Sequence, residues 1–267
     1  MNNNFRQKAN YEFYDLVDII RCLREPGGCP WDAEQTHESI KKNLIEETYE
    51  VIEAINKKNK ALLCEELGDL LMQVVFHAQM EDEICSFSID NVTDGVCKKL
   101  IERHPHVFGD TNVSGVSEVL RNWDAIKRNS KGHADTSQAM LSIPKELPAL
   151  MRSTKVQQKA ASCGFDWQDI SGALEKLDEE IIELRNALSS GKAEESLEEL
   201  GDVLFSAVNV SRFAGHDAEE ALTNATDKFL KRFITVEQLA KDEGIDLKTA
   251  GIEKLNLLWD IAKQNKE

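Results

Sequence analysis

The sequence has few residues that break helices and few aromatic rings. Its 267 residues include five prolines and 14 glycines, and aromatic residues make up only 6%. With 41% hydrophobic residues, this composition excludes a disordered chain and is typical of a helical globular protein. At roughly 150 residues per domain, the length favours two domains.

Positive charge and long apolar runs are also scarce. Lys and Arg total 32 against 48 Asp and Glu, a net charge of −16, so we expect a surface that repels nucleic acid and anionic lipid. The most apolar stretch, residues 70–76, is too short to span a bilayer, and the first ten residues lack the apolar core of a signal peptide. The six cysteines form no C-x-x-C pair. We therefore expect a soluble, cytoplasmic protein with no nucleic-acid or membrane partner.

Apolar residues recur at helical spacing along most of the chain, and no segment shows convincing strand alternation. This pattern predicts an all-α fold. The helical pattern lapses in a polar stretch that contains glycine and proline, which favours a linker at residues 129–147. The predicted domains are therefore residues 1–128 and 148–267.

The two halves share an internal repeat. Seven residues of the first half recur unchanged 133 positions later, pairing Glu46, Glu47, Glu50, Glu66, Leu67, Gly68 and Asp69 with Glu179, Glu180, Glu183, Glu199, Leu200, Gly201 and Asp202. Two further matches keep their internal spacing: Lys99 and Arg103 with Lys228 and Arg232, and Trp123 and Lys127 with Trp259 and Lys263. The repeat predicts two tandem copies of one helical module.

Each copy carries two carboxylate pairs whose members are three residues apart, on one face of a helix. The quartets are Glu47, Glu50, Glu66 and Asp69 in the first copy and Glu180, Glu183, Glu199 and Asp202 in the second. The first quartet centres on Lys58, in a polar segment, and the second centres on Gly191. In an antiparallel helical hairpin the pairs would face each other roughly 14 Å from the turn, at about 1.5 Å of rise per residue.

Four converging carboxylates repel one another and raise their own pKa values, so this arrangement favours cations between them. Oxygen ligands select hard ions, which points to Mg²⁺, with Mn²⁺ as the alternative. Because Mg²⁺ commonly takes further ligands from substrate phosphates, the quartets indicate phosphate ester or anhydride chemistry. The alternative is a solvated acidic helix face, since 30% of the residues are charged.

The acidic pattern E-E-x-x-E followed by E-x-x-D occurs together with three other motifs: G-C-P-W-D at 28–32, R-H-P-H-V-F at 103–108 and G-F-D-W at 164–167. Over essentially its whole length the chain resembles the MazG family of all-α nucleoside triphosphate pyrophosphohydrolases. The resemblance implies Mg²⁺-dependent hydrolysis of NTP or dNTP to the monophosphate and pyrophosphate, with broad base tolerance. It also implies a homodimer whose subunits complete helical bundles.

The resemblance also implies roles for individual residues. It assigns the metal ions to Glu180, Glu183, Glu199 and Asp202, with Glu47, Glu50, Glu66 and Asp69 as a second candidate site. It places phosphates at Lys228, Arg232 and Lys263, with Lys176 as a weaker candidate, and the base or sugar under Trp259. Lys228 and Arg232 as ordinary surface charges, and Trp259 as a core residue, stay open as alternatives.

The main hypothesis is hydrolysis of the α–β anhydride, in which Glu179 or Glu198 orients or deprotonates the attacking water. The rival is a non-catalytic, metal-binding helical protein that regulates or binds a partner. We expect the second copy to carry most of the hydrolysis, because Arg103 runs directly into a proline that ends or bends its helix. The second copy also departs from the first: it lacks the C-P and H-P-H segments, and Glu194 and Glu195 replace the basic character expected there.

Overall fold

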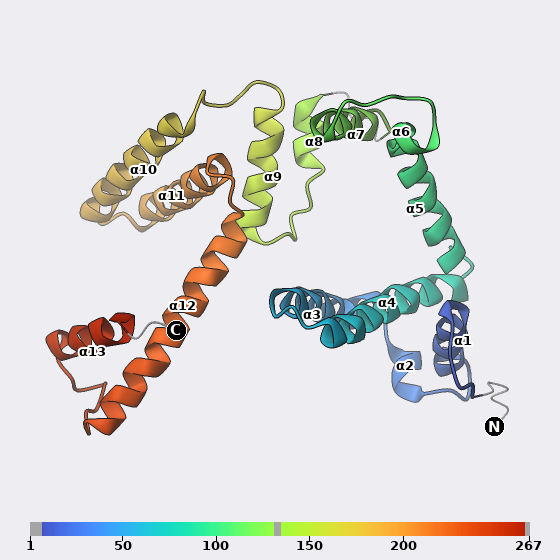
Figure 1. Ribbon diagram of the computed structural model, residues 1–267, viewed down its shortest axis with the longest axis horizontal. Coiled ribbons are helices and arrows are strands. Elements are labelled where there is room, and N and C mark those ends of the chain that lie inside the picture. Colours follow the sequence, from blue (N-terminus) through green and yellow to red (C-terminus); the bar gives the residue numbers. More distant parts are fainter. Residues whose placement is uncertain (1–6, 131–134, 265–267) are drawn as a thin grey trace. The chain divides into compact units, whose positions relative to one another are not determined.

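The computed structural model describes residues 7–130 and 135–264, and every regular element within those ranges is an α-helix (Figure 1). The predicted all-α fold is confirmed. The chain forms two compact units, residues 1–127 and 128–267. Residues 1–6, 131–134 and 265–267, which belong to the predicted domains and linker, lie outside the described residues.

The N-terminal unit is built around the hairpin of α3 and α4. Its helices are α1 (Phe13–Arg24), α2 (Pro30–Glu34), α3 (His37–Asn56), α4 (Lys60–Glu83), α5 (Ile89–Arg103), α6 (Pro105–Phe108) and α7 (Val116–Ser130). Helix α1 packs against α4, and their buried side chains form one apolar core with Ile40 of α3 and Ile89 of α5. This core includes Ile20, Val75 and Phe76.

The C-terminal unit repeats the hairpin with α10 and α11. Its helices are α8 (Thr136–Leu141), α9 (Ala149–Ala161), α10 (Ile170–Ser190), α11 (Ala193–Phe213), α12 (Ala218–Asp242) and α13 (Ile252–Gln264). Helix α9 packs against α11 and α12, while α13 packs on α12 through Val236, Ala240, Leu258 and Ala262. Helix α8 lies inside the segment predicted as a linker, and the predicted domain boundaries stay a prediction.

Both hairpins turn at the residue on which the acidic quartet centres. Lys58 and Gly191 have φ angles of 51° and 71°, in the left-handed region, and each lies between the two helices of its hairpin. A left-handed residue commonly terminates a helix. After Lys58, the side chain of Asn59 caps α4 by accepting hydrogen bonds from the backbone N–H groups of Ala61 and Leu62. The short turns therefore place the carboxylate pairs opposite each other.

The proline of the first copy ends a helix, as its position predicts. Helix α5 stops at Arg103, and Pro105 is the first residue of α6. His104 lies between the two helices, and its Nδ1 donates a hydrogen bond of 2.6 Å to the carbonyl of Leu100. In the second copy, α12 continues through Lys228 and Arg232 to Asp242 without a break.

Two further sequence features can be compared with the structure. All six cysteines are free. Among the described residues, we find no helix with both the length and the apolar character needed to cross a lipid bilayer.

Candidate functional site

In the C-terminal unit, α10 and α11 bring three carboxylates within reach of a single cation. Glu180 on α10 and Glu199 and Asp202 on α11 each offer one oxygen, and these oxygens lie within 4.8 Å of one another. Glu180 is buried, Glu199 is half-buried and Asp202 is exposed, so the cluster opens to solvent on one side. An all-oxygen donor set of this kind suits a hard divalent cation.

The N-terminal unit builds an equivalent cluster. Glu47 on α3 and Glu66 and Asp69 on α4 also place one oxygen each within 4.8 Å of the others, and all three residues are half-buried. Partial burial, followed by the charge of Asp69, raises the pKa of Glu47 above its ordinary value. Both copies of the repeat therefore contain a cluster that could hold a metal.

The fourth member of each quartet lies beside its cluster. Glu50 is outside the three-residue group, yet its charge is, after loss of hydration, the largest cause of the raised pKa of Glu66. Glu183 likewise lies next to Glu180, and loss of hydration followed by a hydrogen bond with Glu180 raises the pKa of Glu183. The carboxyl groups therefore repel one another, as expected of a site that binds cations.

Lys176 provides a positive charge at the second cluster. Its Nζ lies 2.8 Å from a carboxylate oxygen of Glu180 and 2.9 Å from one of Glu179. The hydrogen bond to Glu180 is the largest cause of a strongly raised Lys176 pKa. The residue 133 positions earlier is Asn43, so the first copy has a neutral side chain at this point. The two clusters thus have the same types of carboxylate residue, but only the second has a lysine side chain beside it.

The two candidate general bases flank the second cluster. Glu179 is exposed and paired with Lys176. Glu198 is exposed on α11, and its charge contributes to the raised pKa of Glu199, after loss of hydration and the charges of Glu180 and Asp202. Neither belongs to the group of oxygens that surrounds the cation-sized space.

The remaining candidate substrate residues lie on α12 and α13. Lys228 is exposed and Arg232 half-buried one turn later on α12. The Trp259 ring centroid lies 5.2 Å from that of Phe229, beside an apolar cavity of about 550 Å³ between the two helices. Lys263 forms an ion pair of 2.7 Å with Asp260. Helix α13 packs against α12, and Figure 1 shows it near the end of α12 remote from α10 and α11. A single chain therefore does not bring Trp259 to the carboxylate cluster.

The matching residues of the first copy contact one another. The guanidinium of Arg103 lies over the Trp123 ring, 5.5 Å from its centroid, and the His104 ring packs edge-on against the same indole at 4.8 Å. These contacts gather the end of α5 and helix α7 around one tryptophan. The guanidinium of Arg103 therefore makes a cation–π contact with Trp123 in this structure.

Two long-range ion pairs escaped the sequence analysis. Arg24 donates to both carboxylate oxygens of Glu83, at 2.7 and 2.9 Å, and so ties α1 to the end of α4. Arg212 binds Asp166 of the G-F-D-W motif in the same two-oxygen manner and ties that loop to α11. The G-C-P-W-D and G-F-D-W motifs pointed to the neighbouring loops. Sequence spacing could not predict ion pairs between residues 59 and 46 positions apart.

The sequence analysis also missed a buried glutamine. Gln73 is a single polar residue inside the apolar stretch 70–76, and its Oε1 is buried with no hydrogen-bond partner in the described chain. A single polar residue within an apolar stretch was the sequence feature that could have identified this buried amide.

Comparison with known proteins matches this architecture. The MazG nucleotide pyrophosphohydrolase domain matches the chain twice, at residues 35–108 and 168–248, and both acidic quartets lie within these matches. This double match confirms the two tandem helical modules.

Several known proteins match most of this chain. A Thermotoga maritima protein named "Nucleoside triphosphate pyrophosphohydrolase/pyrophosphatase MazG" is 46% identical, over 98% of this chain and 99% of its own length. An Escherichia coli K12 protein named "Nucleoside triphosphate pyrophosphohydrolase" is 40% identical over 93% of this chain and 96% of its own. A Bacillus subtilis protein, "Uncharacterized protein YabN", is 45% identical over 95% of this chain but only 52% of its own length. The chain therefore belongs to the MazG nucleotide pyrophosphohydrolase family.

Proposed function

We propose that this protein hydrolyses nucleoside triphosphates and deoxynucleoside triphosphates to the monophosphate and pyrophosphate, with Mg²⁺ as its metal and Mn²⁺ as a substitute. The observation that carries the proposal is the convergence of Glu180, Glu199 and Asp202 on one cation-sized space in a member of this family. The relatives from Thermotoga maritima and Escherichia coli are named for this activity.

The residues at the second cluster fit a divalent cation. The donors are all carboxylate oxygens. Loss of hydration raises the pKa of Glu183 and Glu199, and the neighbouring carboxylate of Glu180 raises both further. A bound Mg²⁺ would polarise the phosphate oxygens and lower the pKa of a coordinated water. Glu183 adds a fourth carboxylate to the three that hold the ion.

Several polar residues would act on the water and the phosphates. Glu179 or Glu198 orients the attacking water and accepts its proton. Lys176, one turn before Glu180, offers its ammonium group to a phosphate oxygen. These groups would position the water and offset the charge that develops as the α–β anhydride breaks.

In a homodimer, helices α12 and α13 of the second chain would supply the remaining substrate contacts, because α13 does not reach the cluster of its own chain. Lys228 and Arg232 follow each other by one turn on α12 and would bind phosphates. Trp259 would cover the base or sugar, with Lys263 one turn later at a phosphate. Stacking on an indole is tolerant of base identity because every base has a flat π-face, which supports broad base specificity.

Assembly into a homodimer accounts for the apolar faces of the hairpins. Leu67 and Leu71 on α4, and Leu200 and Leu204 on α11, are exposed within one chain. Apolar residues at helical spacing along an exposed face mark a surface for another protein chain. A second copy would cover it symmetrically. Light scattering should therefore report about twice the chain mass of 30.1 kDa, and a monomer at micromolar concentration would contradict the dimer.

Release of pyrophosphate is the direct test of the activity. The purified protein should release pyrophosphate from each common NTP and dNTP in the presence of Mg²⁺, and EDTA should abolish the release. If none of the eight nucleotides is hydrolysed with either Mg²⁺ or Mn²⁺, the rival function as a non-catalytic metal-binding protein takes its place. The predicted cytoplasmic location calls for a separate localisation experiment.

A further inference from the structure

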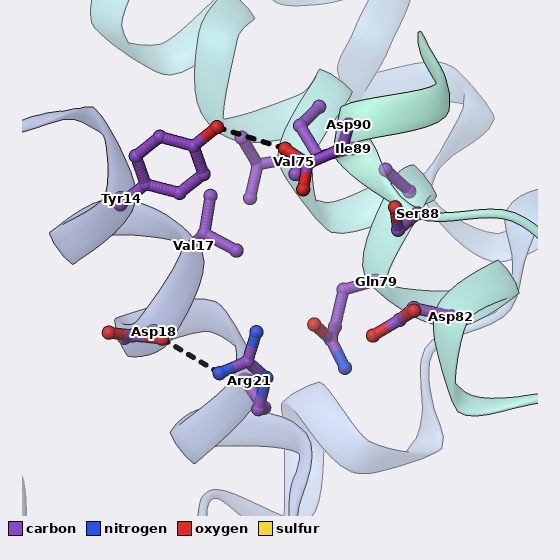
Figure 2. A pocket seen from close by; sticks show the side chains of 11 residues that line it. Tyr14, Val17, Asp18, Arg21, Val75, Gln79, Asp82, Ser88, Ile89 and Asp90 are labelled. Carbon is purple, nitrogen blue, oxygen red and sulfur yellow. Dashed lines mark hydrogen bonds and ion pairs between the residues drawn. The ribbon is translucent and has the colours of Figure 1, made fainter. Parts of the chain in front are cut away.

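The N-terminal unit contains a cavity among α1, α4 and the start of α5 (Figure 2). Its volume is about 240 Å³, somewhat below the roughly 300–1,000 Å³ of pockets for drug-sized ligands. The base of the cavity is apolar and consists of four buried residues, Val17, Val75, Ala78 and Ile89. The cavity therefore has room for a small organic molecule, and its base suits a short aliphatic chain.

Negative charge predominates around this cavity. It is lined by three aspartates, Asp18 on α1, Asp82 on α4 and Asp90 on α5, and by one arginine, Arg21. Arg21 pairs with Asp18 at 2.7 Å, and the Tyr14 hydroxyl donates a hydrogen bond of 2.9 Å to one oxygen of Asp90. The Asp82 carboxylate makes no hydrogen bond or ion pair in the described chain. Because carboxylates outnumber the arginine, the cavity attracts cations and repels phosphates.

A buried amide faces the same cavity. Gln79 is only 7% exposed, and Figure 2 shows its amide group in the space between the side chains of Arg21 and Asp82. Its Nε2 lies 3.4 Å from a Glu83 oxygen, and its Oε1 accepts no hydrogen bond in the described chain. Burying an acceptor without a donor costs free energy, which a ligand with an N–H group recovers. The amide therefore points to a hydrogen-bond donor in the cavity.

The aspartates surround the cavity and do not converge on one point. In the described chain only two groups bring three carboxylate oxygens within 4.8 Å of one another, and both are the hairpin clusters. Figure 2 shows Asp90 beside Tyr14 at one end of the cavity and Asp82 near Gln79 at the other. A divalent metal ion needs all its ligands at about 2.0–2.6 Å from one centre, so this arrangement does not suit one. It suits a molecule with two separate cationic groups.

We propose that this cavity binds an aliphatic diamine, in which two ammonium groups are joined by a short methylene chain. One ammonium group donates to the Asp82 carboxylate and to the Oε1 of Gln79. The methylene chain covers the apolar base. The second ammonium group donates to the oxygen of Asp90 that the Tyr14 hydroxyl leaves free. The ligand would link α1, α4 and α5, and its binding does not depend on the proposed hydrolysis.

Isothermal titration of the full chain with 1,4-diaminobutane tests this proposal. Excess Mg²⁺ is present throughout, so that the carboxylate clusters of the hairpins do not take up the amine. We expect one diamine per chain and about two- to fivefold weaker binding of butylamine, which lacks one exposed ion pair. Diamines of three to six carbons should show an optimum length, because Asp82 and Asp90 are fixed on different helices. Attraction by the overall charge of −16 alone would give no such optimum.

Two variants have matched controls in the same unit. Asp82→Asn should weaken diamine binding about two- to fivefold, whereas Glu102→Gln, which removes the same charge from an exposed residue of α5 outside the cavity, should leave it unchanged. Gln79→Leu should weaken binding about tenfold or more, because the lost hydrogen bond is to a charged group. Gln73→Leu is its control, since Gln73 is also 7% exposed on α4 but lines a different cavity.

Hydrogen exchange of the wild-type chain supplies a readout that needs no variant. Bound diamine should slow amide exchange in α1 and in the first turns of α5, and leave α12 unchanged. This measurement decides the matter if Gln79→Leu fails to fold. The inference is overturned if the wild type binds no diamine, if Asp82→Asn and Glu102→Gln have equal effects, or if exchange in α1 and α5 does not change. None of these readouts requires hydrolysis, so they leave the proposed activity untouched.

Discussion

Replacing Leu258 with alanine should release α13 from α12. Leu258 is 0% exposed, and of the four buried residues that join the two helices, only it and Val236 are larger than alanine. Burying one such side chain contributes about 1.5–3 kcal/mol, so this pair supplies roughly 3–6 kcal/mol of the docking. A buried Leu→Ala substitution costs about 2–5 kcal/mol, which is comparable to that contribution.

Hydrogen exchange measures this release directly. If α13 opens without unfolding the rest of the unit, its protected amides should exchange about 30- to several-thousand-fold faster, as a cost of about 2–5 kcal/mol requires. Because α13 carries Trp259 and Lys263, KM for the nucleotide should rise in the same variant.

A neighbouring leucine provides the control for this substitution. Leu257 is 53% exposed in the chain, so Leu257→Ala should change α13 exchange and KM far less than Leu258→Ala. If Leu258→Ala leaves α13 protected and KM unchanged, then α13 is held by other contacts and our account of its docking is wrong.

Three further predictions concern the clusters. Glu199→Ala with Asp202→Ala should reduce NTP hydrolysis by orders of magnitude, whereas Glu66→Ala with Asp69→Ala should reduce it little; the reverse pattern would make the first copy the catalytic one. Lys176→Asn should lower kcat/KM about 100-fold, the typical cost of removing one group that stabilises transition-state charge, and an unchanged value would limit Lys176 to balancing charge in the metal-free chain. Glutamates whose pKa is raised above 4.5 in the folded clusters stabilise the fold below pH 4.5, and this contribution is lost as the pH rises through their folded pKa values. In EDTA, protonation of these glutamates should therefore raise the unfolding midpoint as the pH falls from 7 to 5. Saturating Mg²⁺ should remove this rise. If calorimetry gives the same dependence of the midpoint on pH with EDTA and with Mg²⁺, the prediction is wrong.

Local sequence patterns were enough to predict the hairpins. Spacing of three placed each carboxylate pair on one helix face, and the centre of each quartet coincides with a left-handed turn residue, Lys58 or Gly191. These features depend on helical periodicity and on turns of a few residues, which the sequence encodes within short windows. The end of α5 before Pro105 was predictable for the same reason.

Contacts between distant segments were not predictable in this way. The two arginine pairs, Arg24 with Glu83 and Arg212 with Asp166, join residues 59 and 46 positions apart, and neither pair stands out in a chain in which 30% of the residues are charged. A cavity of about 190 Å³ in the N-terminal unit is lined by residues of α1, α2, α3 and α4, so it exists only when these four helices are packed together. The sequence therefore predicted which helices carry the acidic residues, and the packing of those helices determined what surrounds them.

The surroundings of the clusters are what distinguish the two copies. Both copies contain a cluster of two glutamates and one aspartate, so a difference in chemistry between them would come from neighbouring groups. The second copy places the ammonium of Lys176 2.8 Å from Glu180, where a phosphate could recruit it once a metal ion neutralises that carboxylate. The first copy has neutral Asn43 at this position, and its Arg103 is committed to Trp123. Cleavage of an anhydride needs cations that stabilise the developing charge, so this difference in positive charge is a further reason to expect the second copy to carry most of the hydrolysis.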